Sequence, residues 1–220
     1  MMKMMNSAII GLLLGVFAPV RAELPPLIPR EVLFGNPVKA SPRISPDGKQ
    51  LSFLAPDKNN VLQVWVQTLG QDDAKQVTSD KKRGIRNHLW TYLPNTLLYL
   101  QDNDGDENFH LYAVDVVSGK VRDLTPFPGV RAQPVDLDKD HPEEMLIGLN
   151  RRNKRVFDVY RVTLSTGEMK LDTENPGNVV GWVTDNDFRV RIAQVPTMDG
   201  GNELLVRNDE KSEWKKLLRW

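Results

Sequence analysis

Residues 108–119 read NFHLYAVDVVSG, an apolar strand with an aromatic residue inside it and a glycine turn at its end. The same pattern occurs in LQVWVQTLG (62–70) and in RVFDVYRVTLSTG (155–167), and the central aromatic residues are 47 and 48 positions apart. A weaker fourth copy, NELLVRND (202–209), lies 45 positions further on. The chain therefore contains an internal repeat. Aromatic residues recur at this repeat spacing, and we expect all five of them to pack between successive units: Trp65, Trp90, Tyr112, Tyr160 and Trp182.

Each copy is preceded by one apolar segment with strand character and followed by another. A further strand stands before these three, so each unit has four strands. Four short strands in units of this length are typical of propeller blades. A β-sandwich of unrelated strands is the alternative, and the regular spacing favours the propeller. No strand that would close a ring follows Trp220. The sequence therefore predicts an all-β fold, an incomplete β-propeller of about four blades with four antiparallel strands each, at residues 41–80, 84–126, 130–174 and 178–220.

The first 22 residues have the features of a secretory signal peptide. Lys3 precedes an 11-residue apolar run, AIIGLLLGVFA, and small residues precede a cleavage point after Ala22. That run is too short to span a bilayer as a mature helix. An uncleaved anchor is the alternative. We expect export to the periplasm or the medium, no stable membrane anchor after cleavage, and a proline-rich extended segment over residues 23–40.

Composition excludes several classes of function. The 220 residues carry 29 basic and 29 acidic side chains, so the chain lacks the basic footprint of a nucleic-acid-binding domain. There is no cysteine, which excludes disulfides and thiolate metal sites, and three histidines leave little room for a histidine metal cluster. We expect no cofactor and no metal, and we expect His88, His110 and His141 to be structural or solvated.

The loop DNDGDE (102–107) holds four carboxylates within six positions, between two predicted strands. A calcium site of the EF-hand type needs glycine at position 6 and glutamate at position 12, and this loop has neither. A solvated hairpin loop with Asn103 and Gly105 at positive φ is the plainest interpretation. A third interpretation pairs these carboxylates with the basic loop NRRNKR (150–155), which occupies the equivalent place in the next blade.

Four segments resemble the N-terminal propeller of exported serine peptidases of the prolyl oligopeptidase family, in particular its dipeptidyl-peptidase and acylaminoacyl-peptidase branch. The most specific is YLQDNDGDENFHLYAVD (99–115). SPRISPDGKQLSFLAP (41–56) is less specific, because other exported propellers such as the TolB-like ones also carry SPDGK. The remaining two are IPREVLFGNP (28–37) and DLTPFPGVRAQ (123–133).

The resemblance implies a propeller joined to a C-terminal α/β-hydrolase domain whose serine lies on a G-x-S-x-G turn. No G-x-S-x-G occurs in these 220 residues, so no catalytic residue is assigned and the chain alone is expected to be inactive. Its expected role is to gate access of short peptides and to dock the hydrolase domain. Candidate contacts to peptide or hydrolase are Asp104, Asp106, Glu107, Arg151 and Arg152. The alternative function is a non-enzymatic periplasmic TolB-like propeller that binds a protein partner.

Overall fold

The computed structural model describes residues 25–220 of the chain, so the predicted signal peptide lies outside the described residues. The chain divides into two compact units, Met1–Gly35 and Asn36–Trp220. Among the described residues, no helix is long and apolar enough to cross a bilayer.

The described part of the first unit contains one short helix, α1, at Arg30–Phe34. The expectation that residues 23–40 are extended throughout is therefore wrong for these five residues. Pro29 directly precedes the helix, where its missing N–H costs nothing because the first N–H groups of a helix have no intrahelical partner. Glu31 lies in the first turn, where the helix dipole favours a carboxylate.

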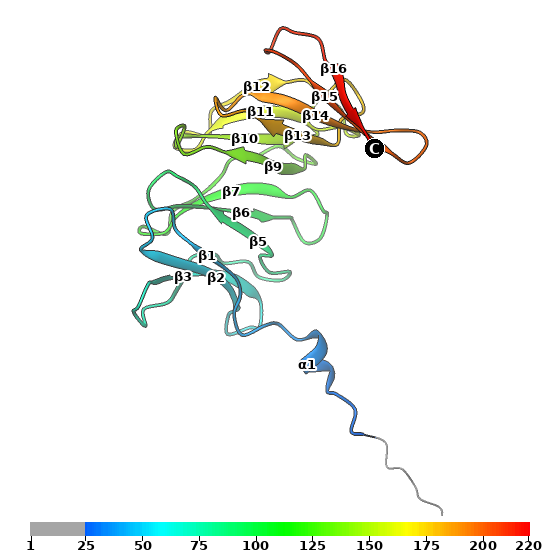
Figure 1. Ribbon diagram of the computed structural model, residues 1–220. Coiled ribbons are helices and arrows are strands. Elements are labelled where there is room, and N and C mark those ends of the chain that lie inside the picture. Colours follow the sequence, from blue (N-terminus) through cyan, green and yellow to red (C-terminus); the bar gives the residue numbers. More distant parts are fainter. Residues whose placement is uncertain (1–24) are drawn as a thin grey trace, which may run out of the picture. The chain divides into compact units, whose positions relative to one another are not determined.

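The second unit consists of four sheets, each with four antiparallel strands in sequence order, as predicted (Figure 1). We call these sheets blades 1 to 4. Blade 1 comprises β1 (Ala40–Ile44), β2 (Gln50–Pro56), β3 (Leu62–Thr68) and β4 (Lys75–Gln76). Blade 2 comprises β5 (Asn87–Trp90), β6 (Thr96–Gln101), β7 (His110–Asp115) and β8 (Val121–Asp123). Blade 3 comprises β9 (Ala132–Leu137), β10 (Glu144–Leu149), β11 (Asp158–Thr163) and β12 (Met169–Thr173). Blade 4 comprises β13 (Gly181–Thr184), β14 (Val190–Pro196), β15 (Asn202–Val206) and β16 (Lys215–Arg219).

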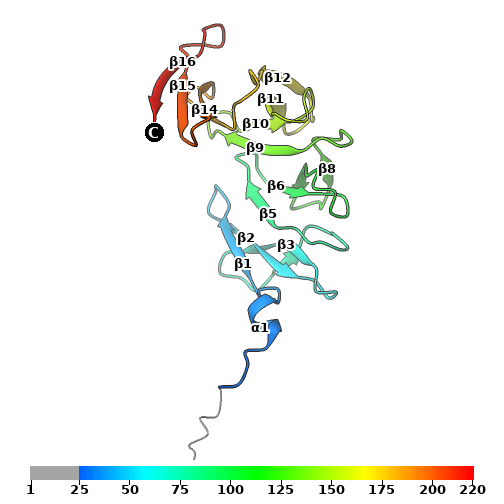
Figure 2. The same ribbon diagram turned by 90° about the vertical axis from the view of Figure 1, so that its right-hand side faces the viewer.

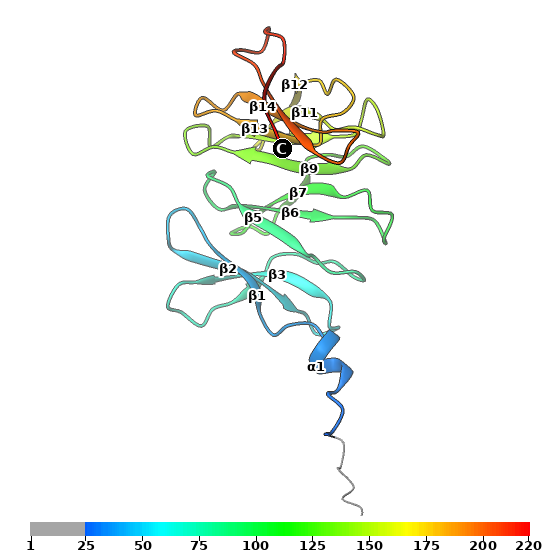
Figure 3. The same ribbon diagram turned by 45° about the vertical axis from the view of Figure 1, so that its right-hand side comes forward.

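The blades follow one another in an arc. The first strands of neighbouring blades come together, with β1 beside β5 (Figure 2) and β9 beside β13. Blades 1 and 4 lie at opposite ends of the unit in Figures 1 and 3. The described residues thus form an open arc, which agrees with the prediction of an incomplete ring.

The central strands pack on both faces, and this explains their nearly continuous apolar sequence. On β10, Met145, Ile147 and Leu149 face blade 2 in one buried cluster. Leu146, one residue out of phase, packs with Phe188 of blade 4. Side chains alternate between the faces of a strand, so a strand buried between two blades must be apolar at every position.

The recurring aromatic residues pack as predicted in four of five cases. Trp90 and Tyr112 pack against the cluster between blades 1 and 2, and Tyr160 packs against the cluster between blades 2 and 3. Trp182 contacts the clusters around Phe188 and Ala193. Trp65 belongs to none of these clusters, and its indole N–H donates to the Ala55 carbonyl at 3.0 Å.

Candidate functional site

The predicted site residues share one end of the blades, which we call the site face. It is formed by the connections between the second and third strands of each blade, at residues 57–61, 102–109, 150–157 and 197–201. The first strands begin at this same end, because Asn87 pairs with Leu100 and Ala132 pairs with Leu149. The linker that leads into each first strand therefore lies beside these loops.

In the acidic loop (residues 102–107), two carboxylates accept hydrogen bonds from the backbone of the loop itself. Asp106 accepts the backbone N–H groups of Asn108 at 3.0 Å and Asn103 at 3.2 Å. Desolvation acts to raise the pKa of Asp106, but these hydrogen bonds outweigh it and the pKa is lowered. Asp102 accepts the backbone N–H of Glu107 at 3.3 Å. The loop is thus closed by its own carboxylates.

The backbone of this loop differs from the expectation at one position. Gly105 has a positive φ of 94°, as predicted, but the other left-handed residues are Asp104 (55°) and Glu107 (60°) rather than Asn103. The Asp106 carboxylate accepts the Asn103 N–H at 3.2 Å, and Asn103 is not among the residues at positive φ. A glutamate in this region is uncommon and marks a strained, well-determined position.

The pairing of the acidic loop with the basic loop of blade 3 is wrong. Asp104 instead pairs with Lys82, in the linker that precedes its own blade, at 2.6 Å. Arg152 turns back onto its own blade, where it binds Asp158 through two nitrogens at 2.8 and 3.0 Å. In the described part of the chain, no ion pair joins the two loops.

The physical reason lies in the burial of Asp158. Its side chain is fully buried, and a buried carboxylate needs a charged partner far more than an exposed one does. Arg152 supplies that partner, and its hydrogen bond to Asp158 raises the pKa of the Arg152 guanidinium. The exposed carboxylates of residues 102–107 cannot compete for it.

Two neighbours of Arg152 are also engaged locally. Arg151 stacks over the Phe127 ring at 4.1 Å from its centroid, and Lys154 donates to the Gly129 carbonyl at 2.6 Å. Both contacts join the loop of blade 3 to the linker that precedes it. Of the five predicted contact residues, Glu107 and Arg151 make no side-chain hydrogen bond or ion pair within residues 25–220, and Arg151 instead stacks on Phe127.

Sequence reasoning missed Arg86 and Arg131, which line a cavity of about 320 Å³ on the site face. The Arg131 guanidinium lies 5.6 Å from the centroid of the Phe109 ring, which lines the same cavity. The sequence repeat contained a signal for this pair, because Arg86 and Arg131 occupy equivalent positions directly before the first strands of two consecutive blades.

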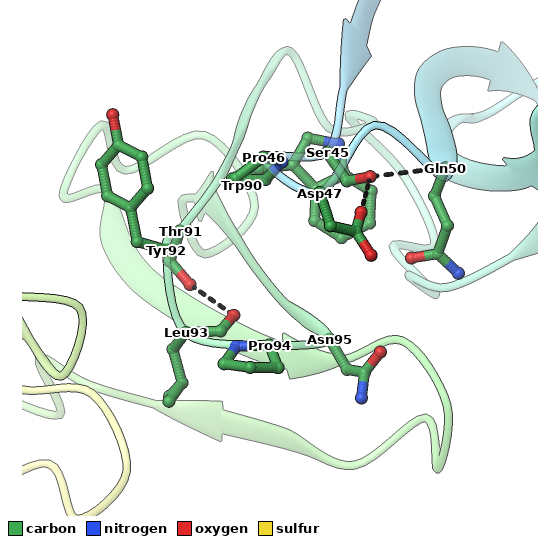
Figure 4. A pocket seen from close by; sticks show the side chains of 10 residues that line it. All are labelled: Ser45, Pro46, Asp47, Gln50, Trp90, Thr91, Tyr92, Leu93, Pro94 and Asn95. Atoms are coloured by element: carbon green, nitrogen blue, oxygen red, sulfur yellow. Dashed lines mark hydrogen bonds between the residues drawn. The ribbon is translucent and has the colours of Figure 1, made fainter. Parts of the chain in front are cut away.

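A second cavity, of about 160 Å³, lies at the other end of the strands between the SPDGK turn and the β5–β6 loop (Figure 4). Two of its polar side chains, Ser45 and Asp47, are hydrogen-bonded within the turn. The Ser45 hydroxyl donates to Asp47 at 2.7 Å and accepts the Gln50 N–H at 2.9 Å. The bond from Ser45 is the main cause of the lowered pKa of Asp47.

No histidine forms a catalytic arrangement in the described residues. His88 Nε2 lies 3.0 Å from Ser52 Oγ, but Ser52 is fully buried and His88 is 2% exposed, so no substrate reaches them. His110 Nδ1 lies 2.8 Å from Asp123 and its ring stacks on Tyr112. Residues 25–220 also contain no cluster of three side chains suited to a metal ion.

The chain is similar in sequence to two curated peptidases. It is 44% identical over 191 residues to dipeptidyl aminopeptidase BIII of Pseudoxanthomonas mexicana, a match that covers 86% of this chain and 27% of the relative. It is 33% identical over 208 residues to dipeptidyl peptidase family member 6 of Caenorhabditis elegans, covering 88% of this chain and 28% of the relative. The chain thus spans little more than a quarter of these relatives. No protein-family model matches it.

Solved structures support the fold. A structure from a study of two prolyl endopeptidases aligns with a TM-score of 0.61 at 12% identity, covering 82% of this chain and 28% of that one. A putative TolB from Agrobacterium tumefaciens aligns with a TM-score of 0.55 at 15% identity, covering 80% and 63%. At such identities the likeness concerns the fold alone, and it does not separate peptidase propellers from TolB. The sequence relatives favour the peptidases.

Proposed function

Because this chain is a propeller region related to those of dipeptidyl peptidases in the prolyl oligopeptidase family, we propose that it gates and binds short peptides for an α/β-hydrolase domain. The observation that carries the proposal is 44% identity to a dipeptidyl aminopeptidase across 86% of the chain. The activity of the whole protein, its peptide substrates and the hydrolase partner are part of this proposal.

Glu107 is the residue we assign to the peptide amino group. It is exposed on the site face, its backbone is in the left-handed region, and its carboxylate has no hydrogen bond or ion pair within the described residues. Asp104, Asp106, Arg151 and Arg152 shape the surface around it and offer contacts to the hydrolase domain. An ion pair with a peptide ammonium would give an otherwise strained glutamate its function.

Export is also proposed. Residues 1–22 carry the pattern of a cleaved signal peptide, and mass spectrometry of the exported protein should find Glu23 at the N-terminus. A soluble product that retains Met1 would contradict export.

The peptidase proposal is tested in the native host with antibodies raised against residues 36–220. The captured polypeptide should react with a fluorophosphonate probe and release the chromophore from a dipeptidyl nitroanilide. The purified 220-residue chain should do neither, because it contains no G-x-S-x-G serine.

The competing function is a TolB-like propeller that binds a protein partner without catalysis, favoured by the structural likeness to TolB. Capture of the propeller with a stable protein partner, and with no fluorophosphonate-reactive chain, would establish that alternative and exclude the peptidase.

A further inference from the structure

A basic residue recurs at one position of the blade repeat. The pairs Val38-Lys39, Ile85-Arg86 and Val130-Arg131 each stand directly before the first strand of a blade. Ile85 and Val130 are buried, at 0% and 4% exposure, while the basic residue that follows each of them is exposed. The equivalent pair of blade 4 is Val179-Val180, which ends the series. The repeat therefore places a cationic side chain at the start of the first strand in each of blades 1 to 3.

Arg86 and Arg131 meet at one cavity of the site face, with blade 2 on one side and blade 3 on the other. Its apolar wall is made by Leu100, Phe109 and Pro134. The Ala132 N–H donates to the Phe109 carbonyl at 2.8 Å, which ties the start of β9 to the acidic loop and holds Arg131 over the ring. The cavity thus combines two guanidinium groups with an aromatic and aliphatic wall.

Neither guanidinium forms an ion pair or hydrogen bond within the described residues. Other arginines of this chain do so, since Arg152, Arg161 and Arg191 each bind a carboxylate at 3.0 Å or less. Three of the four acids of the loop are already engaged: Asp104 binds Lys82, and Asp102 and Asp106 close their own loop. The fourth, Glu107, forms no ion pair with either arginine within the described residues. An isolated exposed arginine needs no explanation, but two that line one cavity form a site for an anion.

We propose that this cavity binds the C-terminal residue of a short peptide, with Arg86 and Arg131 on its carboxylate and an apolar side chain against Phe109. Guanidinium groups bind carboxylates through paired N–H donors, which gives both strength and orientation. The apolar wall favours a peptide that ends in an apolar residue. This inference deepens the proposed function and rests on it, because it assumes that peptides are the ligands of the site face.

The test is isothermal titration calorimetry of the polypeptide purified from the native host, because the propeller region alone is expected to self-associate. The probes are N-acetyl-Ala-Phe with a free carboxylate and the same peptide as its C-terminal amide. The free acid should bind at least about tenfold more tightly than the amide, a difference of the size that a charged hydrogen bond provides. Equal affinities, or no binding of the acid, would overturn the proposal.

Variants locate the binding. Arg86→Gln and Arg131→Gln should each weaken acid binding by about tenfold and leave amide binding unchanged. Arg131→Lys keeps the charge but loses the planar donor pair, so it should fall between wild type and Arg131→Gln. Arg155→Gln is the matched control, because Arg155 is an exposed arginine of the site face that does not line the cavity.

Circular dichroism and thermal melts confirm that each variant is folded. Wild-type affinity in both folded glutamine variants would refute the assignment. This outcome is independent of the fluorophosphonate experiment, which tests for the hydrolase domain and does not depend on carboxylate binding.

Discussion

His88 shows how one buried residue links the stability of this chain to pH. It lies between blades 1 and 2 with 2% of its surface exposed, and its Nδ1 atom has no hydrogen-bond partner. Desolvation, with a smaller contribution from the charge of Arg43, lowers its pKa from 6.5 to about 4. The folded protein thus holds the imidazole neutral at a pH where the unfolded chain protonates it.

We predict that stability falls as the pH drops from 6.5 toward 4. The unfolded state binds the extra proton in this window, so the His88 contribution is complete above pH 6.5 and is lost progressively below it. The loss amounts to at most about 3 kcal/mol, at about 1.4 kcal/mol per pKa unit. Urea unfolding at a series of pH values checks this. In His88→Gln, the free energy of unfolding should change less between pH 6.5 and 4 than in wild type. Parallel curves of unfolding free energy against pH for wild type and His88→Gln would show that His88 does not cause the loss of stability.

Lys82 and Asp104 test the corrected charge pairing at the same scale. The two side chains are 67% and 58% exposed, so their interaction is screened by solvent and salt. A double-mutant cycle with Lys82→Ala and Asp104→Ala should give a coupling of about 0.2–1 kcal/mol that shrinks at high salt. The cycle of Asp104→Ala with Arg152→Ala is the control and should be additive. A larger coupling energy between Asp104 and Arg152 than between Asp104 and Lys82 would instead support an ion pair between the two loops.

At the scale of the element, β10 and β16 represent the two environments of a propeller strand. The side chains of β10 at positions 145–149 are all buried between blades, whereas every residue of β16 is exposed. Leucines on these strands therefore contribute very differently to the stability of the fold.

We predict that Leu146→Ala destabilises the chain by about 2–5 kcal/mol, because it leaves a cavity beside Phe188 that the packed blades cannot close. Leu217→Ala on β16 is the matched control, since Leu217 is 57% exposed and its truncation should cost about 0.5 kcal/mol or less. Chemical denaturation of both variants measures the difference. Similar losses would mean that the blade 3–blade 4 contact contributes little.

At the scale of the whole unit, the two ends of the arc carry exposed apolar side chains. Ile44 of blade 1 is 62% exposed, and Val183, Leu218 and Trp220 of blade 4 are 52–58% exposed. Exposed apolar patches and unpaired strand edges favour association.

We predict that residues 23–220 alone self-associate or fold incompletely. An uncovered blade face of roughly 400 Å² represents on the order of 10 kcal/mol of lost burial, as much as the net stability of a typical domain. Sedimentation velocity should show oligomers, and thermal melts should be broad. A monodisperse monomer with a sharp cooperative transition would contradict this.

The positions of the strands and blades follow from the amino-acid sequence alone. Alternating and continuous apolar segments specify which residues face a neighbouring blade, and the repeat spacing specifies where each blade begins. These features are local or periodic, so one chain is enough to see them. The SPDGK turn is of the same kind: Gly48 has a φ of 73° and Asp47 accepts the Lys49 N–H, because the turn chemistry lies in adjacent residues.

Which charged side chains form ion pairs depends on the folded chain and could not be predicted from the repeat. Arg152 binds the buried Asp158 of its own blade, and Asp104 binds Lys82, although the repeat placed the acidic and basic loops in equivalent positions. Ion pairs depend on a few ångströms of loop conformation and on which carboxylate is buried, and neither is written in the spacing of the residues. The same reason hid the cavity between Arg86 and Arg131, whose side chains become neighbours only when two blades pack together.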